Sequence, residues 1–108
     1  MEDLKWDRSF ALEQAGDDEE ILEELLELFR DSSDTDLGKI KAGLSAGDSE
    51  AVADAAHSVK GASASLGIEA IRQLAHDIEK AGRSNDLNFV RDNLERFESL
   101  LDQASQLT

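Results

Sequence analysis

The C-terminal stretch of the chain reads LNFVRDNLERFESLLDQA over residues 87–104 and carries the pattern that decides the fold. Its apolar positions are spaced 3-4-3-4-3, which places them in one stripe along an α-helix and suits the seam of a helical bundle. The stripe consists of Leu87, Val90, Leu94, Phe97, Leu101 and Ala104. No segment shows the strict alternation of a half-buried β-strand. We therefore predict an all-α fold.

The preceding segments repeat their apolar residues at the same helical spacing. Gly16, Gly47, Gly67 and Gly82 look like helix ends, and the polar stretch at 31–34 interrupts the pattern. We expect helices at about 6–13, 17–30, 33–46, 49–66, 68–82 and from 87 onward, with Asp48 or Ser49 and Asp86 as caps. Four long helices with short links predict an antiparallel four-helix bundle, with a short N-terminal helix and one extra short helix at 33–46.

Composition limits the classes of function that remain open. The 108 residues suffice for a single domain, which we expect to span 1–108. A formal net charge of -14 disfavours nucleic acid and anionic membranes as partners. The chain has no Cys, which excludes disulfides and suits a reducing cytoplasm. No apolar run is long enough to span a membrane, and Met1 to Trp6 do not resemble a signal segment. We expect a cytoplasmic protein without membrane contact.

Both histidines of the chain fall on outward helix faces. At about 100° per residue, His57 lies about 160° from Val59, the centre of its apolar stripe, so its ring should face solvent. His76 is also about 160° from its core centre, and we interpret it as a bystander. Small and polar residues share the face of His57, which should be accessible and nearly flat. They are Glu50, Ala53, Asp54, Lys60, Gly61 and Ala64.

Glu79 should lie close to His57 if the chain reverses at Gly67. Antiparallel helices then bring His57 opposite about Asp77, so Glu79 lies within about 3 Å of its level. Its carboxylate can accept a hydrogen bond from one imidazole nitrogen and leave the other free as a nucleophile. In the alternative interpretation, Glu79 is a surface residue paired with Arg83 or Arg72.

The sequence around His57 carries a specific motif. Residues 56–67 read AHSVKGASASLG, in which His-x-x-Lys-Gly is followed six residues later by Gly. This pattern resembles the signature of histidine-containing phosphotransfer (HPt) domains, and the resemblance covers most of residues 16–86. The further matching segments are Gly16-Asp17 before a Leu-rich helix that ends in Phe29-Arg30, and Ile78-Glu79-Lys80-Ala81-Gly82-Arg83.

The resemblance implies a role for each residue of the motif. His57 would accept a phosphoryl group from the aspartyl phosphate of a response-regulator receiver domain and return it to another receiver. Lys60, on the same face, would offset the charge of the phosphoryl oxygens. Gly61 would leave bare backbone where the receiver approaches. The expected docking residues are Gly61, Ala64, Ala53 and Asp54, with one flank of the helix at 19–29 and Phe10 beside them.

The remaining chemistry is limited. We expect no metal site and no cofactor. A di-metal helical bundle needs Glu-x-x-His twice, whereas this chain has Asp54-x-x-His57 and Gln73-x-x-His76, both on outward faces. No phosphate loop or nucleotide motif occurs. We therefore predict that the chain is not an enzyme and has no autokinase activity. The receiver would supply Mg²⁺ and most of the catalysis.

We interpret the chain as a phosphorelay intermediate whose partners are receiver domains, either alone or within a hybrid histidine kinase. Two alternatives stay open. The first is the phosphoacceptor domain of a chemotaxis-type kinase, in which an ATP-binding domain is the phosphoryl donor. The second is an acidic helical interaction module without chemistry.

Overall fold

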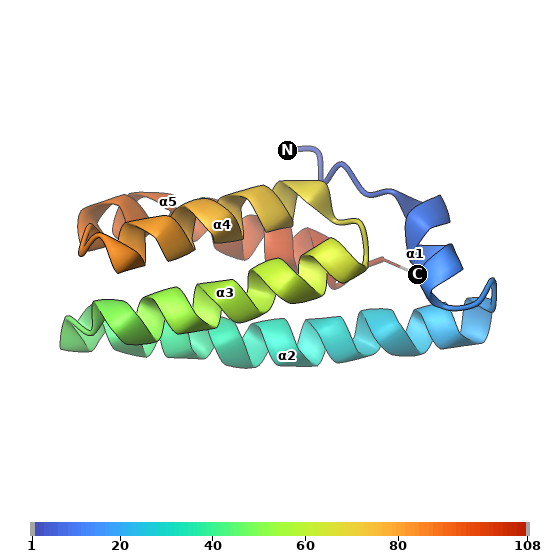
Figure 1. The fold of residues 1–108 in the computed structure, drawn as a ribbon, viewed down its shortest axis with the longest axis horizontal. Helices are drawn as coiled ribbons and strands as arrows, with labels where there is room; N and C mark the ends of the chain where they lie inside the picture. The colour runs from blue at the N-terminus through green and yellow to red at the C-terminus, as the bar shows by residue number, and fades with distance from the viewer. Residues whose placement is uncertain (1, 108) are drawn as a thin grey trace.

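The computed structural model describes residues 2–107, which form five α-helices (Figure 1). The helices are α1 (Arg8–Gln14), α2 (Glu19–Ala46), α3 (Ser49–Ser65), α4 (Glu69–Arg83) and α5 (Leu87–Ala104). Short turns connect α2 to α3, α3 to α4 and α4 to α5. These four helices therefore alternate in direction and form an antiparallel bundle, while α1 lies at one end. The predicted four-helix bundle with a short N-terminal helix is confirmed. Met1 and Thr108, the ends of the predicted single domain, lie outside the described residues.

The extra helix predicted at 33–46 is wrong, because α2 continues through the polar stretch at 31–34. Ser33 is only 4% exposed, and its hydroxyl donates to the carbonyl of Arg30 at 3.2 Å. A serine that bonds to its own helix in this way does not break it. The 28 residues of α2 span about 42 Å, which equals the 42 Å longest extent of the molecule. This helix therefore extends along the whole length of the bundle (Figure 1).

The ends of most helices follow the local signals in the sequence. The carboxylates of Asp48 and Asp86 accept backbone N–H bonds in the first turns of α3 and α5 at 3.1 and 3.2 Å, as predicted for caps. Gly16, Gly47 and Gly67 have φ angles of 67°, 68° and 67°, a left-handed conformation that ends or redirects the chain. The turns beside α3 are therefore fixed by short-range chemistry.

The helix predicted to end at Gly82 ends one residue later, at Arg83, and Gly82 lies in its last turn where α4 crosses α3. A Cβ at this position would stand 2.9 Å from the Cβ of Ala53 and 3.0 Å from the carbonyl oxygen of Ser49. Ala53 is fully buried at this crossing, which corrects the expectation that it lies on the docking face. Because α3 packs against both α2 and α4, its buried arc is wider than the stripe centred on Val59 suggests.

The two helix-interior glycines Gly82 and Gly38 should respond in opposite ways to alanine. Gly82→Ala should lower the free energy of unfolding by about 1–3 kcal/mol, because the new methyl group overpacks the crossing. Gly38→Ala should raise it by about 0.5–1 kcal/mol, because nothing lies within 4 Å of a Cβ there and alanine favours the helix. Urea unfolding followed by circular dichroism measures both. Equal effects of the two substitutions would contradict the close crossing.

Buried aliphatic and aromatic side chains hold α3 and α4 at a fixed separation. Val59 of α3 and Ile78 of α4 are at most 1% exposed; Val59 lies two residues from His57, and Ile78 directly precedes Glu79. A close-packed interior of this kind leaves the backbone little freedom. Fully buried large side chains also include Phe97, Leu22, Ile40, Ile68, Ile71, Leu74, Leu100, Val52 and Val90. Within residues 2–107, no helix combines the length and apolarity that crossing a bilayer requires.

Candidate functional site

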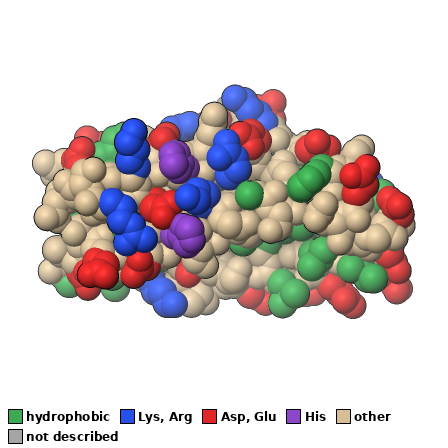
Figure 2. Space-filling view, in the orientation of Figure 1, with side chains coloured by type: hydrophobic (Ala, Val, Ile, Leu, Met, Phe, Trp, Pro, Cys, Tyr) green, Lys and Arg blue, Asp and Glu red, His purple; other side chains and the backbone are tan. Residues whose placement is uncertain are grey.

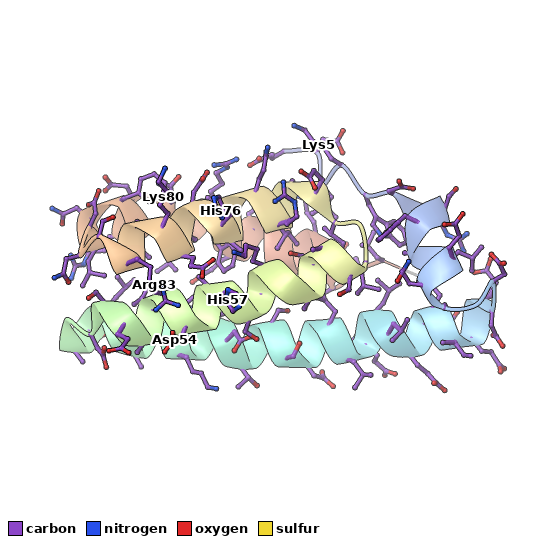
Figure 3. The ribbon with its side chains drawn as sticks, viewed as in Figure 1. Lys5, Asp54, His57, His76, Lys80 and Arg83 are labelled. Carbon is purple, nitrogen blue, oxygen red and sulfur yellow. The ribbon has the colours of Figure 1, made fainter. Side chains whose placement is uncertain are left out.

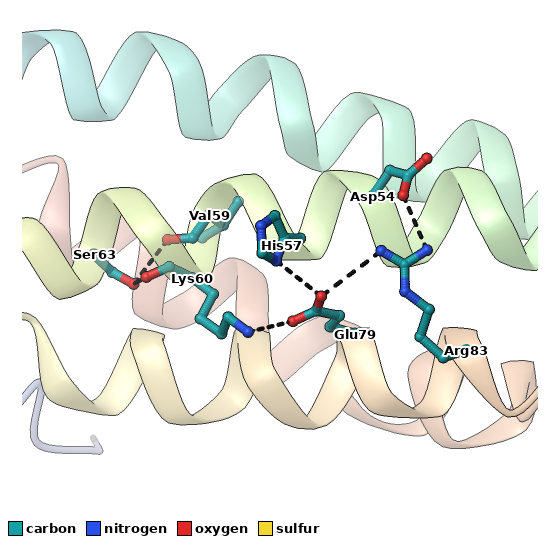
Figure 4. A network of polar contacts seen from close by, with 7 residues as sticks. All are labelled: Asp54, His57, Val59, Lys60, Ser63, Glu79 and Arg83. Carbon is teal, nitrogen blue, oxygen red and sulfur yellow. Dashed lines mark hydrogen bonds and ion pairs between the residues drawn. The ribbon is translucent and has the colours of Figure 1, made fainter.

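His57 lies on the accessible face of α3, with 63% of its side chain exposed. Its Nδ1 atom lies 2.9 Å from Oε2 of Glu79, which reaches across from α4 (Figure 4). The two residues are separated by 22 positions in the sequence, and the turn at Gly67 brings them to the same level of adjacent antiparallel helices. The structure thus places the carboxylate beside the imidazole, as the helical geometry indicates.

Lys60 approaches the other oxygen of the same carboxylate. Its Nζ atom lies 2.6 Å from Oε1 of Glu79, which makes the contact a close ion pair. Glu79 is 13% exposed. The pKa of the Glu79 carboxyl is lowered, chiefly by the Lys60 ammonium and further by His57, while burial works in the opposite direction. Glu79 is therefore ionised at neutral pH.

The ionised carboxylate determines the tautomer of His57. A carboxylate can only accept hydrogen bonds, so a neutral imidazole at 2.9 Å must carry its proton on Nδ1 and donate it to Glu79. The Nε2 atom then keeps its lone pair. Because most of the side chain is exposed, this nitrogen can reach an electrophile presented by a partner. The arrangement provides an oriented nucleophile beside an ammonium group.

Arg83 extends the contacts of this site, which helical spacing alone does not reveal. Its Nη1 atom donates to Oδ1 of Asp54 at 3.0 Å, and its Nη2 atom lies 3.7 Å from Oε2 of Glu79 (Figure 4). The sequence indicates only that Glu79 and Arg83 are one helical turn apart. Arg72, the other alternative partner of Glu79, instead forms an ion pair with Glu69. Glu79 therefore contacts His57 and Arg83 together, so the two interpretations of this residue are compatible.

The surface around His57 is bare on one side and charged on the other. Gly61 and Ala64 are exposed, and no atom lies within 4 Å of a Cβ placed on Gly61. Asp54 is exposed too, although its carboxylate is held by Arg83. Figure 2 shows histidine, basic and acidic side chains gathered over α3 and α4. The predicted docking residues other than Ala53 thus lie on the surface.

An apolar groove lies between α2, α3 and α1, beyond the bare part of α3. It has a volume of about 450 Å³, and Leu28, on its rim, is 64% exposed. Phe10, which the sequence analysis associates with this region, is half-buried. Hydrophobic side chains appear over the same end of the molecule in Figure 2. The groove is lined by Gln14, Leu25, Leu28, Phe29, Ser32, Ala62, Ser65 and Leu66.

His76 projects from α4 on the exposed surface, as Figure 3 shows, and has no hydrogen-bond partner among the described residues. Its surroundings differ from those of His57, which has the Glu79 carboxylate at its ring. Across residues 2–107, no three or more His, Cys, Asp or Glu side chains are grouped to hold a metal ion.

Comparison with known proteins identifies the family. The family model described as "Hpt domain" matches residues 24–107, so the chain belongs to the histidine-containing phosphotransfer (HPt) domain family. Its role is histidine phosphotransfer in a phosphorelay, in which HPt domains work with receiver domains.

The fold is also similar to that of a solved relative. The crystal structure of histidine-containing phosphotransfer protein B (HptB) from Pseudomonas aeruginosa PAO1 superposes with a TM-score of 0.86 at 25% sequence identity. The match covers 94% of this chain and 88% of that chain. A comparison with curated proteins gave no match.

Proposed function

We propose that His57 is the phosphoryl acceptor of a single phosphotransfer module comprising residues 1–108, which works in the cytoplasm. The observation that carries this proposal is the pairing of Nδ1 with Glu79 at 2.9 Å on a ring that is 63% exposed. The pairing favours a lone pair on Nε2, and the exposure lets a macromolecular donor reach it. Among residues 2–107, no carboxylate is paired with the ring of His76.

The phosphoryl donor is the aspartyl phosphate of a receiver domain. The lone pair of His57 Nε2 attacks phosphorus and forms a P–N bond, while the P–O bond to the aspartate breaks and its electron pair stays on the leaving carboxylate. The Nδ1 proton remains on the ring and donates to Glu79, whose negative charge stabilises the positive charge that develops on the imidazole. Transfer to a second receiver reverses these steps.

Lys60 supplies positive charge where the phosphoryl oxygens arrive. It follows His57 by three residues, so the two side chains leave the same face of α3. The Lys60 side chain is 27% exposed and its ammonium contacts Glu79, within reach of a group on the neighbouring imidazole. Since the phosphoryl group carries negative charge, we infer that the Lys60 ammonium binds its oxygens during transfer.

Transfer from a purified phosphorylated receiver tests this function. Labelled phosphoryl should move from the receiver to this chain, in the acid-labile and base-stable form typical of phosphohistidine. Peptide mapping should place the label on the segment that contains His57. Label on a segment that contains only His76 would overturn the proposal, and so would the absence of label with every receiver encoded in the same genome.

Gly61→Leu tests whether the bare part of α3 is the docking surface. A Cβ at position 61 meets nothing within 4 Å and the position is exposed, so the fold should stay intact. The new side chain would project beside His57 and hold the receiver away, so we expect transfer to slow about ten-fold or more. Stopped-time transfer assays measure the rate. Gly38→Leu is the matched control, because Gly38 also has open space around it but lies on α2. Equal rates for both variants would place the docking surface elsewhere.

A further inference from the structure

The carboxylate of Glu79 is shared by two cations that approach it from different directions. Lys60, from α3, lies 2.6 Å from Oε1, whereas Arg83, from α4 itself, lies 3.7 Å from Oε2. Arg83 is also bonded to Asp54 of α3 at 3.0 Å. The resting protein therefore uses Lys60 as the close partner of Glu79 and keeps Arg83 at a longer distance.

Phosphorylation of His57 disturbs this arrangement if Lys60 turns to the phosphoryl oxygens, as the proposed function requires. Oε1 of Glu79 is buried, and the side chain is 13% exposed. A carboxylate in such a place is costly without a compensating cation. At the same moment its charge is most needed, because the phosphorylated ring holds its Nδ1 proton against Glu79.

We propose that Arg83 is a positioning residue that takes over Glu79 when Lys60 moves to the phosphoryl group. The inference rests on the proposed function of Lys60. The guanidinium is already anchored between Asp54 and Glu79, so a small side-chain movement closes the 3.7 Å gap. The guanidinium has five N–H donors in a planar fork, so it can donate to the carboxylates of Asp54 and Glu79 at once. A lysine ammonium, whose donors sit on a single atom, does this less well.

If Arg83 replaces Lys60 as the partner of Glu79, the effects of substituting the two residues on the pKa of Glu79 should be non-additive in a double-mutant cycle. The charged and titratable groups in contact with Glu79 are Lys60 and His57 from α3 and Arg83 from α4, with Asp54 behind Arg83. In the parent protein, Lys60 is the main cause of the lowered pKa of Glu79. Arg83→Gln alone should therefore leave that pKa nearly unchanged, whereas in a Lys60→Ala background it should raise the pKa clearly.

NMR titration of the Glu79 carboxyl carbon measures this cycle without any phosphoryl transfer. The four proteins are the parent, the two single variants and the double variant, and His57 is present in all of them, so its effect cancels. A non-additive rise in the pKa confined to the double variant supports the proposal. If Arg83→Gln shifts the pKa of Glu79 by the same small amount with and without Lys60, the proposal for Arg83 is wrong. That result would leave the proposed function of His57 unaffected.

A kinetic experiment tests the role of Arg83 during phosphorylation itself. With phosphoramidate as a small phosphoryl donor, Arg83→Gln should phosphorylate His57 about two- to five-fold more slowly than the parent, the loss expected for one partly exposed charge contact. Arg83→Lys should restore part of the rate, because an ammonium supplies the charge but not the fork of donors. Arg72→Gln is the matched control, because Arg72 is an arginine of the same helix whose ion pair is with Glu69 and not with Glu79. A rate for Arg83→Gln equal to that of Arg72→Gln overturns the proposal.

Discussion

His57→Gln should take up no detectable label from a phosphorylated receiver. A glutamine amide nitrogen has no available lone pair, so the P–N bond cannot form. The amide can still donate to Glu79, and position 57 is on the surface, so the helix should keep its structure. Circular dichroism should show an unchanged helix content and unfolding temperature. The expected change is therefore a complete loss of function without a loss of fold.

His76→Gln is the matched control for this variant. It removes the second exposed imidazole from the chain and leaves the pairing of His57 with Glu79 untouched. We expect it to accept label at the parental rate. If His57→Gln took up label as well as the parent, the assignment of the acceptor would be wrong.

Lys60→Ala should slow transfer from a receiver by about 10- to 100-fold, somewhat less than the loss of one donor in a closed site, because the Lys60 side chain is 27% exposed. The side chain lies outside the core, so the variant should fold normally. Rapid-quench measurement of label on the chain gives the rate. Lys41→Ala is the control, because Lys41 also pairs with a glutamate of another helix, Glu98 at 2.7 Å. A parental rate for Lys60→Ala would remove this lysine from the mechanism.

The pairing of His57 with Glu79 could be predicted from the sequence because it depends on two well-defined quantities. The rise of an α-helix per residue is fixed, and the reversal at Gly67 sets the register between α3 and α4. Together they place the two residues at one level before any side chain is considered. The outward direction of His57 follows from the helical period alone.

Other features depend on tertiary contacts and could not be predicted in this way. Gly82 marks the end of α4 to within one residue, but the sequence alone does not show that Ala53 of another helix approaches it too closely for a side chain. Ser33 reads as a helix breaker until its burial and its bond to Arg30 are known. The bond between Arg83 and Asp54 joins residues 29 positions apart through a long, flexible side chain, whose direction no periodicity fixes.

The missing side chain at Gly82 has a consequence for the chemistry of His57. Gly82 is three residues from Glu79 on α4, so the contact with Ala53 sets how far apart the two backbones stand beside the imidazole. A larger residue there would push α3 and α4 apart and lengthen the hydrogen bond from His57 to Glu79 that orients the imidazole. We therefore expect the absence of a side chain at this buried position to help set the reactivity of Nε2, although Gly82 does not touch the reacting atoms.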